Sequence, residues 1–387
     1  MVEMVQAMSR LGTESAFEVL ARAKAFEAEG RDIINLGIGQ PDFETPAHIV
    51  EAAVKALRDG HHCYTPANGI PELRQAVATD IAERRRIEVD PDHIMIVPGG
   101  KVTMFFAILM FGNAGTEIIY PNPGFPIYES VINFTGACAV PMALHEDNGF
   151  SFNANEVLSL ITTRTRLVIL NSPANPTGGV VPREEMDRLA EGLEAHPHVA
   201  VLSDEIYSRM LYDGCQHVSL LEYEHLRDRV IMLDGWSKTY AMTGWRMGYG
   251  VWPAGLIAAA TRLSINCHSC VNAAAQWAGI AALTGPQDAV DEMMRAFGER
   301  RRLIGRELNQ IPGFTCIEPG GAFYAFANIT STDMGSQEMQ DKLLNETGVA
   351  TIAGTSFGRL GEGYIRFSYA NSTDNITAAA ARIRNCF

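Results

Sequence analysis

Short apolar runs alternate along this chain with longer stretches in which apolar residues recur every three or four positions. The short runs are typical of strands buried on both faces of a sheet, and the periodic stretches are typical of amphipathic helices. Strands are predicted at Ile94–Val97, Glu117–Tyr120, Leu167–Leu170, Val199–Leu202 and Val230–Leu233. Helical patterns at Lys101–Phe111 and Pro182–Leu193 lie between them. This alternation predicts an α/β fold with a mostly parallel sheet covered by helices on both faces.

A further helix is predicted to begin at Thr45 and Pro46, since proline is common in the first turn of a helix and threonine is a good N-cap. Gly60 would end this helix. Its apolar face would consist of Ile49, Val50, Ala53, Val54 and Leu57.

The pattern changes near Pro286, where a long amphipathic helix through Phe297 and Leu308 leads to Pro312-Gly313. Shorter mixed elements follow, which favours a second, smaller α+β domain. We therefore expect a large domain over 46–285 and a small domain over 286–387. The segment 1–45 is too short to fold alone, and we expect it to pack with the small domain.

Composition narrows the class of protein. The 387 residues include 31 Lys and Arg against 45 Asp and Glu, a formal charge of −14 without clustering of the basic residues. This excludes a nucleic-acid backbone as the expected partner, because such proteins gather basic residues against the phosphates. With no targeting segment over Met1–Arg10 and no stretch of membrane-spanning length, we expect a cytoplasmic protein without a membrane partner.

The seven scattered cysteines are an odd number in a long chain, so we expect reduced thiols. Two short groups, His61-His62-Cys63 and Cys267-His268-Ser269-Cys270, are a possible metal site. Zinc usually requires four convergent ligands, and two groups far apart in the sequence do not predict them. We therefore expect no metal.

The residues that follow the predicted strands carry the chemistry, because ligands of open parallel sheets bind beyond the carboxyl ends of the strands. These residues are Pro98-Gly99-Gly100-Lys101, Pro121-Asn122-Pro123-Gly124-Phe125, Asn171 to Pro176, Ser203-Asp204-Glu205-Ile206-Tyr207 and Asp234-Gly235-Trp236-Ser237-Lys238. Together they describe an anion site beside an aromatic cofactor with a nucleophilic amine.

Each of these residues also has a simpler interpretation. Gly100 and Lys101 at a helix start could bind a phosphate or merely form a turn. Asp204 could keep a pyridine nitrogen protonated or cap the following turn. Asn175 is typical of turns, and Phe125 of core packing.

The segment Gly235-Trp236-Ser237-Lys238-Thr239-Tyr240-Ala241-Met242-Thr243-Gly244-Trp245-Arg246-Met247-Gly248-Tyr249 resembles the pyridoxal-5′-phosphate (PLP) attachment segment of class I aminotransferases. The resemblance extends over nearly the whole chain in order and spacing. Further matching segments are Gly37 to Phe43, Tyr64-Thr65-Pro66 with Gly69 and Leu73-Arg74, Asn171 to Gly179, Asp204 to Tyr207 and Tyr364 to Tyr369. It implies the fold of fold-type I PLP-dependent transferases, with a seven-stranded type of sheet between helices and a smaller α+β domain.

The resemblance also implies roles around the cofactor ring. Lys238 would form the aldimine with PLP and shuttle the proton between the substrate α-carbon and the cofactor. Asp204 would bind the pyridinium nitrogen, Asn175 and Tyr207 the ring hydroxyl, and Phe125 would stack on the ring. Lys238, Asp204 and Tyr207 are thus the expected catalytic residues.

The remaining implied roles concern the two anionic ends of the ligands. The cofactor phosphate would be bound by Gly100, Lys101, Ser237 and Arg246, joined by Tyr64 of the partner subunit of a homodimer with shared active sites. The substrate α-carboxylate would be bound by Arg366, together with Gly39 and Asn175.

Three positions depart from the family pattern, and one of them is Trp236, which is bulkier than the usual occupant. Phe125 stands where aspartate-preferring relatives usually carry tryptophan, and Gly235 stands where many relatives carry a phosphate-binding serine. No second arginine is recognisable that would bind a side-chain carboxylate, so strict aspartate specificity is not predicted. Specificity is expected to depend on the residues around Gly12–Phe17, Phe125 and Ile265–Val271.

The predicted activity is therefore transfer of an amino group from an L-amino acid to a 2-oxo acid by a ping-pong cycle. One alternative keeps the cofactor but ends in elimination or cyclisation, as in a C–S β-lyase. Another is a non-catalytic regulator fused to a DNA-binding domain, which the charge and the short segment before Gly37 disfavour.

Overall fold

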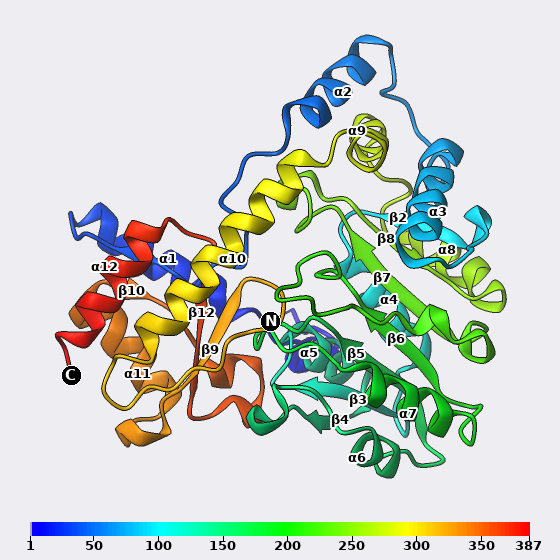
Figure 1. The fold of residues 1–387 in the computed structure, drawn as a ribbon. Helices are drawn as coiled ribbons and strands as arrows, with labels where there is room; N and C mark the ends of the chain where they lie inside the picture. The colour runs from blue at the N-terminus through cyan, green and yellow to red at the C-terminus, as the bar shows by residue number, and fades with distance from the viewer. Residues whose placement is uncertain (1) are drawn as a thin grey trace.

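The computed structural model describes residues 2–387. Its largest element is a seven-stranded sheet in the order β2-β8-β7-β6-β5-β3-β4, in which only β8 runs antiparallel to its neighbours (Figure 1). The strands are β2 (Ile94–Val97), β3 (Glu117–Asn122), β4 (Cys138–Ala143), β5 (Thr165–Asn171), β6 (Ala200–Asp204), β7 (Val230–Gly235) and β8 (Gly248–Val251).

Helices cover both faces of this sheet. The helices of this part are α2 (Ala47–Arg58), α3 (Pro71–Arg85), α4 (Lys101–Phe111), α5 (Ile127–Thr135), α6 (Ala154–Ser159), α7 (Arg183–Leu193), α8 (Ala254–Cys267) and α9 (Ala273–Thr284). Successive strand residues point to opposite faces, so Ile94 and Ile96 belong to the core under α3, α7 and α9. Met95 and Val97 belong to the core under α4, α5 and α8. The predicted α/β architecture is confirmed.

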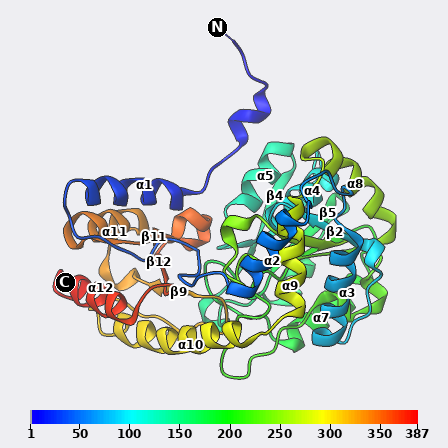
Figure 2. The same ribbon diagram turned by 90° about the horizontal axis from the view of Figure 1, so that it is seen from above.

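A smaller body of helices and short strands lies beside the sheet (Figures 1 and 2). It contains α1 (Ser15–Ala28), α10 (Asp288–Leu308), α11 (Ser336–Lys342) and α12 (Thr373–Arg384). Its strands are the antiparallel set β11 (Ile352–Ala353), β12 (Tyr364–Ser368) and β9 (Tyr324–Asn328), and the parallel pair β1 (Ile34–Asn35) and β10 (Val349–Ala350). It has a core of its own, built on residues such as Phe297, Phe323 and Ile365.

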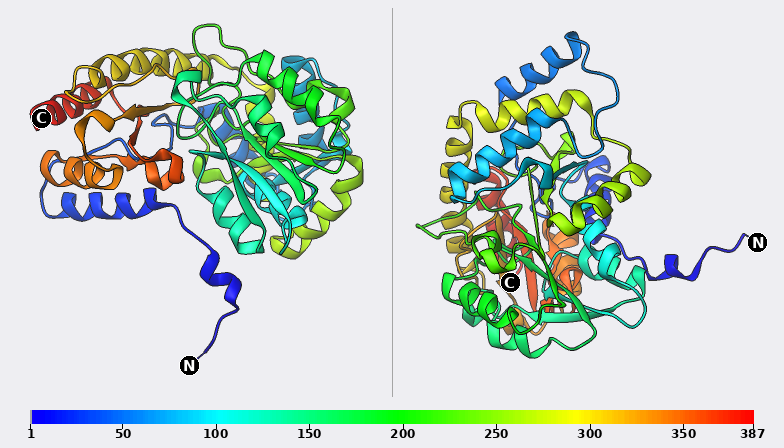
Figure 3. Two further views of the ribbon diagram at one scale, coloured as in Figure 1. Left: turned by 90° about the horizontal axis from the view of Figure 1, so that it is seen from below. Right: turned by 90° about the vertical axis from the view of Figure 1, so that its right-hand side faces the viewer.

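The chain before α1 leaves the smaller body, as Figure 3 shows, and its short helix η1 (Gln6–Arg10) contacts α5 of the sheet-bearing body. Helix α1 itself contacts β10 and β11 of the smaller body. The domain boundaries at 46 and 286 stay a prediction. Within residues 2–387 no helix combines the length and the apolar character that crossing a membrane requires.

The helix predicted to begin at Thr45 differs from the expectation. It begins at Ala47 with Pro46 as N-cap, and no side chain caps it. The Thr45 hydroxyl instead donates to the carbonyl of Ala241 at 2.9 Å and accepts from Trp245 Nε1 at 3.1 Å. The N-cap prediction was wrong because this hydroxyl is used in a tertiary contact.

The predicted apolar face of α2 is only partly buried. Ile49 and Ala53 are buried, while Leu57 is 57% exposed and Val50 is 37% exposed. The buried stripe packs against α9, which covers only the side of α2 that faces it. Two apolar side chains of α2 are therefore left on the surface of the single chain.

Strands β4 and β8 of the sheet were not predicted from the sequence. Strand β4 is an edge strand that contains Pro141, and most of its residues are only half-buried. Strand β8 contains Gly248 and Gly250, and glycine is depleted in strands. A Cβ at Gly248 would lie 2.2 Å from the backbone nitrogen of Gly100, so the close approach of two segments requires glycine there.

Candidate active site

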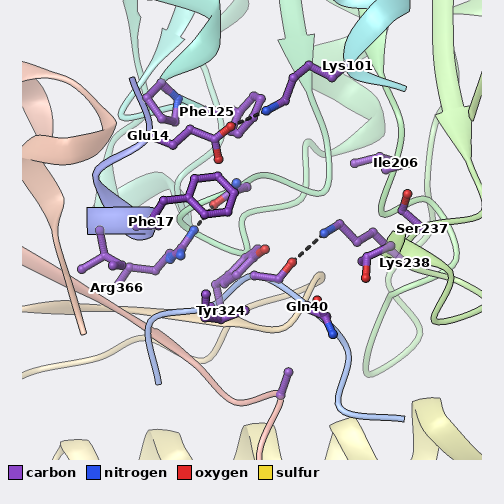
Figure 4. Close-up of a pocket in the computed structure, with 18 of the residues that line it drawn as sticks. Glu14, Phe17, Gln40, Lys101, Phe125, Ile206, Ser237, Lys238, Tyr324 and Arg366 are labelled. Carbon is purple, nitrogen blue, oxygen red and sulfur yellow. Dashed lines mark hydrogen bonds and ion pairs between the residues drawn. The ribbon is translucent and has the colours of Figure 1, made fainter. Parts of the chain in front are cut away.

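A cavity of about 790 Å³ opens at the carboxyl ends of β5, β6 and β7, where the sheet faces α1 and β12. Figure 4 shows part of its lining. Of the site residues predicted from the sequence, those that line it are Gly39, Gly100, Lys101, Phe125, Asn175, Asp204, Tyr207, Ser237, Lys238, Arg246 and Arg366. Tyr64 does not line it and is 91% exposed. The fold thus brings together eleven predicted residues from distant parts of the chain.

Lys238 follows β7 in a turn that directs its side chain into the cavity. Its Nζ donates to the backbone carbonyl of Gly39 at 2.6 Å (Figure 4). Burial has the largest effect on the pKa of Lys238, and together with the nearby cations Arg366 and Arg246 it lowers that pKa to about 8. Part of the amine population is therefore neutral near physiological pH, as a nucleophile or a base requires.

Asp204 is the last residue of β6, and its carboxylate is buried in the cavity wall. The Tyr128 hydroxyl donates to Oδ2 at 2.6 Å, and the backbone N–H of Ile206 donates to Oδ1 at 3.2 Å. Burial raises the pKa of Asp204 to about 6, against the opposing effect of these hydrogen bonds. Asp204 thus caps the following turn, and neither of its hydrogen-bond partners is a cation.

Arg366 lies on β12 with a guanidinium that is fully enclosed. Nη1 donates to Asn175 Oδ1 at 2.9 Å, Nη2 donates to the Gly37 carbonyl at 2.6 Å, and Nε is buried without a partner. The guanidinium also lies over the rings of Tyr324 and Phe357, at 4.5 and 4.6 Å. Burial lowers the pKa of Arg366. Because both oxygen acceptors are neutral, this buried cation is suited to bind a carboxylate of a ligand.

A second cationic end of the cavity lies where β2 leads into α4. Gly99 has a φ of +92°, and a Cβ there would lie 2.1 Å from Nη2 of Arg246. The glycine therefore permits the guanidinium to lie beside the N-terminus of α4, where backbone N–H groups and the helix dipole favour an anion. The hydrogen bond that Arg246 makes, from Nη1 to the Thr243 carbonyl at 2.7 Å, leaves it without a negative partner.

The Lys101 side chain has another partner. Its ammonium forms an ion pair with Glu14 and lies 5.2 Å from the centroid of the Phe125 ring. Phe125 in turn packs edge-to-face on Tyr128, with centroids 5.7 Å apart. The backbone of Lys101 begins α4, whereas its charge is directed at α1.

Comparison with known proteins is consistent with this arrangement. The sequence model of the family described as aminotransferase class I and II matches residues 31–383. The aspartate aminotransferase of Geobacillus stearothermophilus is 36% identical over 99% of this chain and 98% of its own length. The chain belongs to the class I and II aminotransferases.

Solved structures of aminotransferases share the fold. That of the aspartate aminotransferase from Rhizobium meliloti superposes with a TM-score of 0.95 at 33% identity, over 100% of this chain and 98% of that one. That of the aromatic aminotransferase from Pyrococcus horikoshii OT3 gives 0.89 at 34% identity, over 94% of this chain and 98% of that one. The predicted family, fold and enzyme class are confirmed. These relatives support transamination and give no support to the lyase alternative.

Sequence reasoning about this aminotransferase missed Tyr324. Its hydroxyl lies 2.8 Å from that of Tyr207, and a Cβ at Gly39 would lie 2.5 Å from it. Tyr324 begins β9, whose partner strand β12 carries Arg366. The apolar, aromatic-rich run Phe323 to Ala327 would have predicted a strand, but only the pairing with β12 brings the tyrosine to the cavity.

The sequence did not predict which residues at the start of α1 would line the cavity. Those that do are Glu14, which precedes the helix, and Ser15, Ala16, Phe17, Leu20 and Lys24 within it. The expectation that Gly12–Phe17 lies near the substrate agrees with this placement. No group of three or more potential metal ligands is present among residues 2–387. His61 instead packs on Trp277, and His268 Nε2 lies 3.1 Å from the Ser264 hydroxyl.

Proposed function

We propose that this aminotransferase binds PLP in the cavity through Lys238 and moves an amino group from an L-amino acid to a 2-oxo acid. The observation that carries the proposal is the pairing of a lysine of lowered pKa with two arginines that have no acidic partner. Arg246, Arg366 and Lys238 all line the same cavity, and both arginines contribute to the lowered pKa of Lys238. A cofactor with one anionic group and a substrate with another would satisfy the two cations.

The residues present fit the phosphate of PLP. The N-terminus of α4, with Gly99 and Gly100 before it, offers backbone N–H groups, and Arg246 adds a guanidinium beside them. A Cβ at Gly100 would lie 2.9 Å from the Leu233 side chain, so any larger residue at this turn would require Leu233 to shift. We assign the phosphate to this end of the cavity. Ser237 of the same chain and Tyr64 of the partner subunit would be further donors.

The protonated ring nitrogen of PLP would need an anionic partner, and Asp204 can provide it. Burial raises the pKa of this carboxylate to about 6, and no cation is hydrogen-bonded to it, so a cationic N–H would be a favourable partner. When bound, PLP supplies an aromatic electron sink that weakens the Cα–H bond of an attached amino acid. Asn175 and Tyr207 would hold the ring hydroxyl, and Phe125 would pack on the ring.

The chain's own residues then have distinct tasks. Arg366 binds the substrate α-carboxylate and thereby orients the α-carbon toward Lys238. The neutral Lys238 amine removes the proton from the α-carbon and returns it at the cofactor side. The hydrogen-bonded Tyr207 and Tyr324 keep the floor of the cavity rigid, since both rings are buried.

We also propose that the enzyme is a homodimer that shares its active sites. The support is the exposure of Tyr64, which the family resemblance assigns to the neighbouring phosphate site, together with the apolar Val50 and Leu57 of the nearby α2. Burial of these side chains against a second copy would remove apolar surface from water.

Absorbance of the purified protein with PLP tests the proposal. We expect wild type and the surface control Lys55→Ala to develop the absorption of lysine-bound PLP, and Lys238→Ala to lack it. Amino acids should convert that absorption to the pyridoxamine form, and 2-oxo acids should restore it. Equal spectra of wild type and Lys238→Ala would refute the assignment. Release of ammonia and a 2-oxo acid without an acceptor would instead establish the lyase.

A further inference from the structure

One wall of the cavity carries an ion pair between two segments far apart in the sequence. Glu14 immediately precedes α1, and Lys101 is the first residue of α4. The Lys101 ammonium donates to Glu14 Oε1 (Figure 4). The Glu14 side chain is 17% exposed and that of Lys101 is 44% exposed, so the carboxylate is the more enclosed partner.

The chain before Glu14 is anchored to the sheet-bearing body. Arg10 donates from Nε to the Asn133 carbonyl at 2.8 Å and from Nη2 to the Phe134 carbonyl at 3.1 Å. The backbone N–H of Gly12 donates to the Ser130 hydroxyl at 2.9 Å. These contacts on α5 and its end place Glu14 at the cavity independently of its pairing with Lys101.

The Glu14–Lys101 pair lies where the side chain of a bound amino acid would be placed. With the α-carboxylate on Arg366 and the amino group at Lys238, the remainder of an amino acid is directed toward α1. There the cavity is lined by Phe17 and Phe125 as well as by the pair. Figure 4 shows the Phe17 ring between the pair and Arg366.

Glu14 already neutralises the charge of Lys101 where the substrate side chain would lie. A dicarboxylic donor such as aspartate would place its second carboxylate near Glu14, and like charges at a partly desolvated site repel each other. Lys24 of α1 also lines the cavity, but it is exposed, so solvent screens its attraction for a carboxylate. Apolar side chains, in contrast, would gain contact with the two phenylalanine rings.

We propose that the Glu14–Lys101 pair makes this enzyme select amino donors with uncharged, apolar or aromatic side chains and reject dicarboxylic donors. The inference rests on the proposed aminotransferase function and names its substrate class. Glu14 acts as a specificity-determining residue by occupying the cation that a substrate carboxylate would otherwise reach.

The test compares wild type with Glu14→Gln, which is nearly isosteric, and with Glu14→Ser. Glu18→Gln is the matched control, because it makes the same charge change at an exposed position of the helix that Glu14 precedes. The first readout is kcat/KM for aspartate, leucine and phenylalanine. We expect wild type to prefer leucine or phenylalanine. Both Glu14 variants should raise the ratio for aspartate over leucine about tenfold or more, the factor that corresponds to 1.4 kcal/mol.

A second readout is calorimetric binding of maleate, a rigid dicarboxylate, and of 3-phenylpropanoate to the same proteins. Wild type should bind 3-phenylpropanoate more tightly, and the Glu14 variants should gain affinity for maleate only. A wild-type preference for aspartate, or ratios equal in Glu14→Gln and Glu18→Gln, would overturn the inference. Failure of every donor to change the cofactor spectrum would refute the proposed function instead, while the binding data would still decide the role of the pair.

Discussion

The pKa of Lys238 is lowered by its immediate surroundings. Burial has the largest effect, and Arg366 is the strongest of the nearby cations. The protonated form is therefore disfavoured, and the amine becomes neutral as pH rises through about 8 instead of the ordinary value near 10.5. Arg366 thereby has an effect on the lysine in addition to any contact with substrate.

The rate at which the cofactor-free protein captures PLP should consequently rise with pH with a midpoint of about 8, since the neutral amine is the nucleophile. Arg366→Met removes a repelling cation, so the midpoint should move upward. Arg295→Met, on an exposed part of α10, should leave it in place. Stopped-flow absorbance, with Lys238→Ala as the blank, measures these rates. A midpoint that does not respond to Arg366→Met would contradict the electrostatic cause.

The variant Arg366→Lys tests the proposed role of Arg366 in binding the substrate α-carboxylate. The variant keeps a positive charge but loses the planar pair of donors that binds a carboxylate at two points. We expect kcat/KM for all donors to fall about 10- to 100-fold, the range that corresponds to one charge-assisted hydrogen bond. The spectrum of bound PLP should be retained. A loss confined to one donor would argue for a contact with the substrate side chain instead.

At the scale of elements, the strand ends that carry the site are held by a buried charge cluster behind them. Arg85, the last residue of α3, is paired with Glu205 after β6 and with Asp234 of β7. His217 Nε2 lies 2.8 Å from Glu205 Oε2. Burial, followed by Arg85, lowers the pKa of His217 to about 3, so the imidazole is neutral. Asp204 precedes Glu205, so the cluster supports the strand that ends in the site.

Arg85→Met should destabilise the protein by about 3–5 kcal/mol, because it leaves two buried carboxylates without their cation. Urea unfolding followed by circular dichroism measures the change in the free energy of unfolding. Arg58→Met, at the exposed end of α2, should change it by less than about 0.5 kcal/mol. Equal stability of both variants would mean that the Arg85 pairs do not hold α3 to the sheet.

At the scale of the whole molecule, the proposed shared site allows a complementation experiment. Tyr64→Ala and Lys238→Ala should each have low activity. In a mixture whose subunits have been exchanged, a hybrid dimer has one site with both residues intact. About a quarter of wild-type activity should then return, as half of the dimers are hybrids with one working site each. Tyr64 acting within its own subunit would give no recovery.

The local pattern was sufficient for most of the sheet-bearing body. The apolar runs at β2, β3, β5, β6 and β7 are buried on both faces, so hydrophobicity alone is sufficient to predict these strands. The pattern failed at β4 and β8, where an edge position and a close backbone approach permit proline and glycine. It failed also at Thr45, whose side chain could be assigned to a cap only while its distant partner Trp245 was unknown.

The order of residues along the chain determined which chemical groups this protein carries and which strand ends present them, because strand propensity, turn chemistry and the lysine segment are local. Only the tertiary structure decided how those groups are paired. Arg366 contacts a carbonyl 329 residues away, and Lys101 contacts a carboxylate 87 residues away. Such partners depend on how whole elements pack, and pairing decides whether a charge remains available to a ligand or is already neutralised.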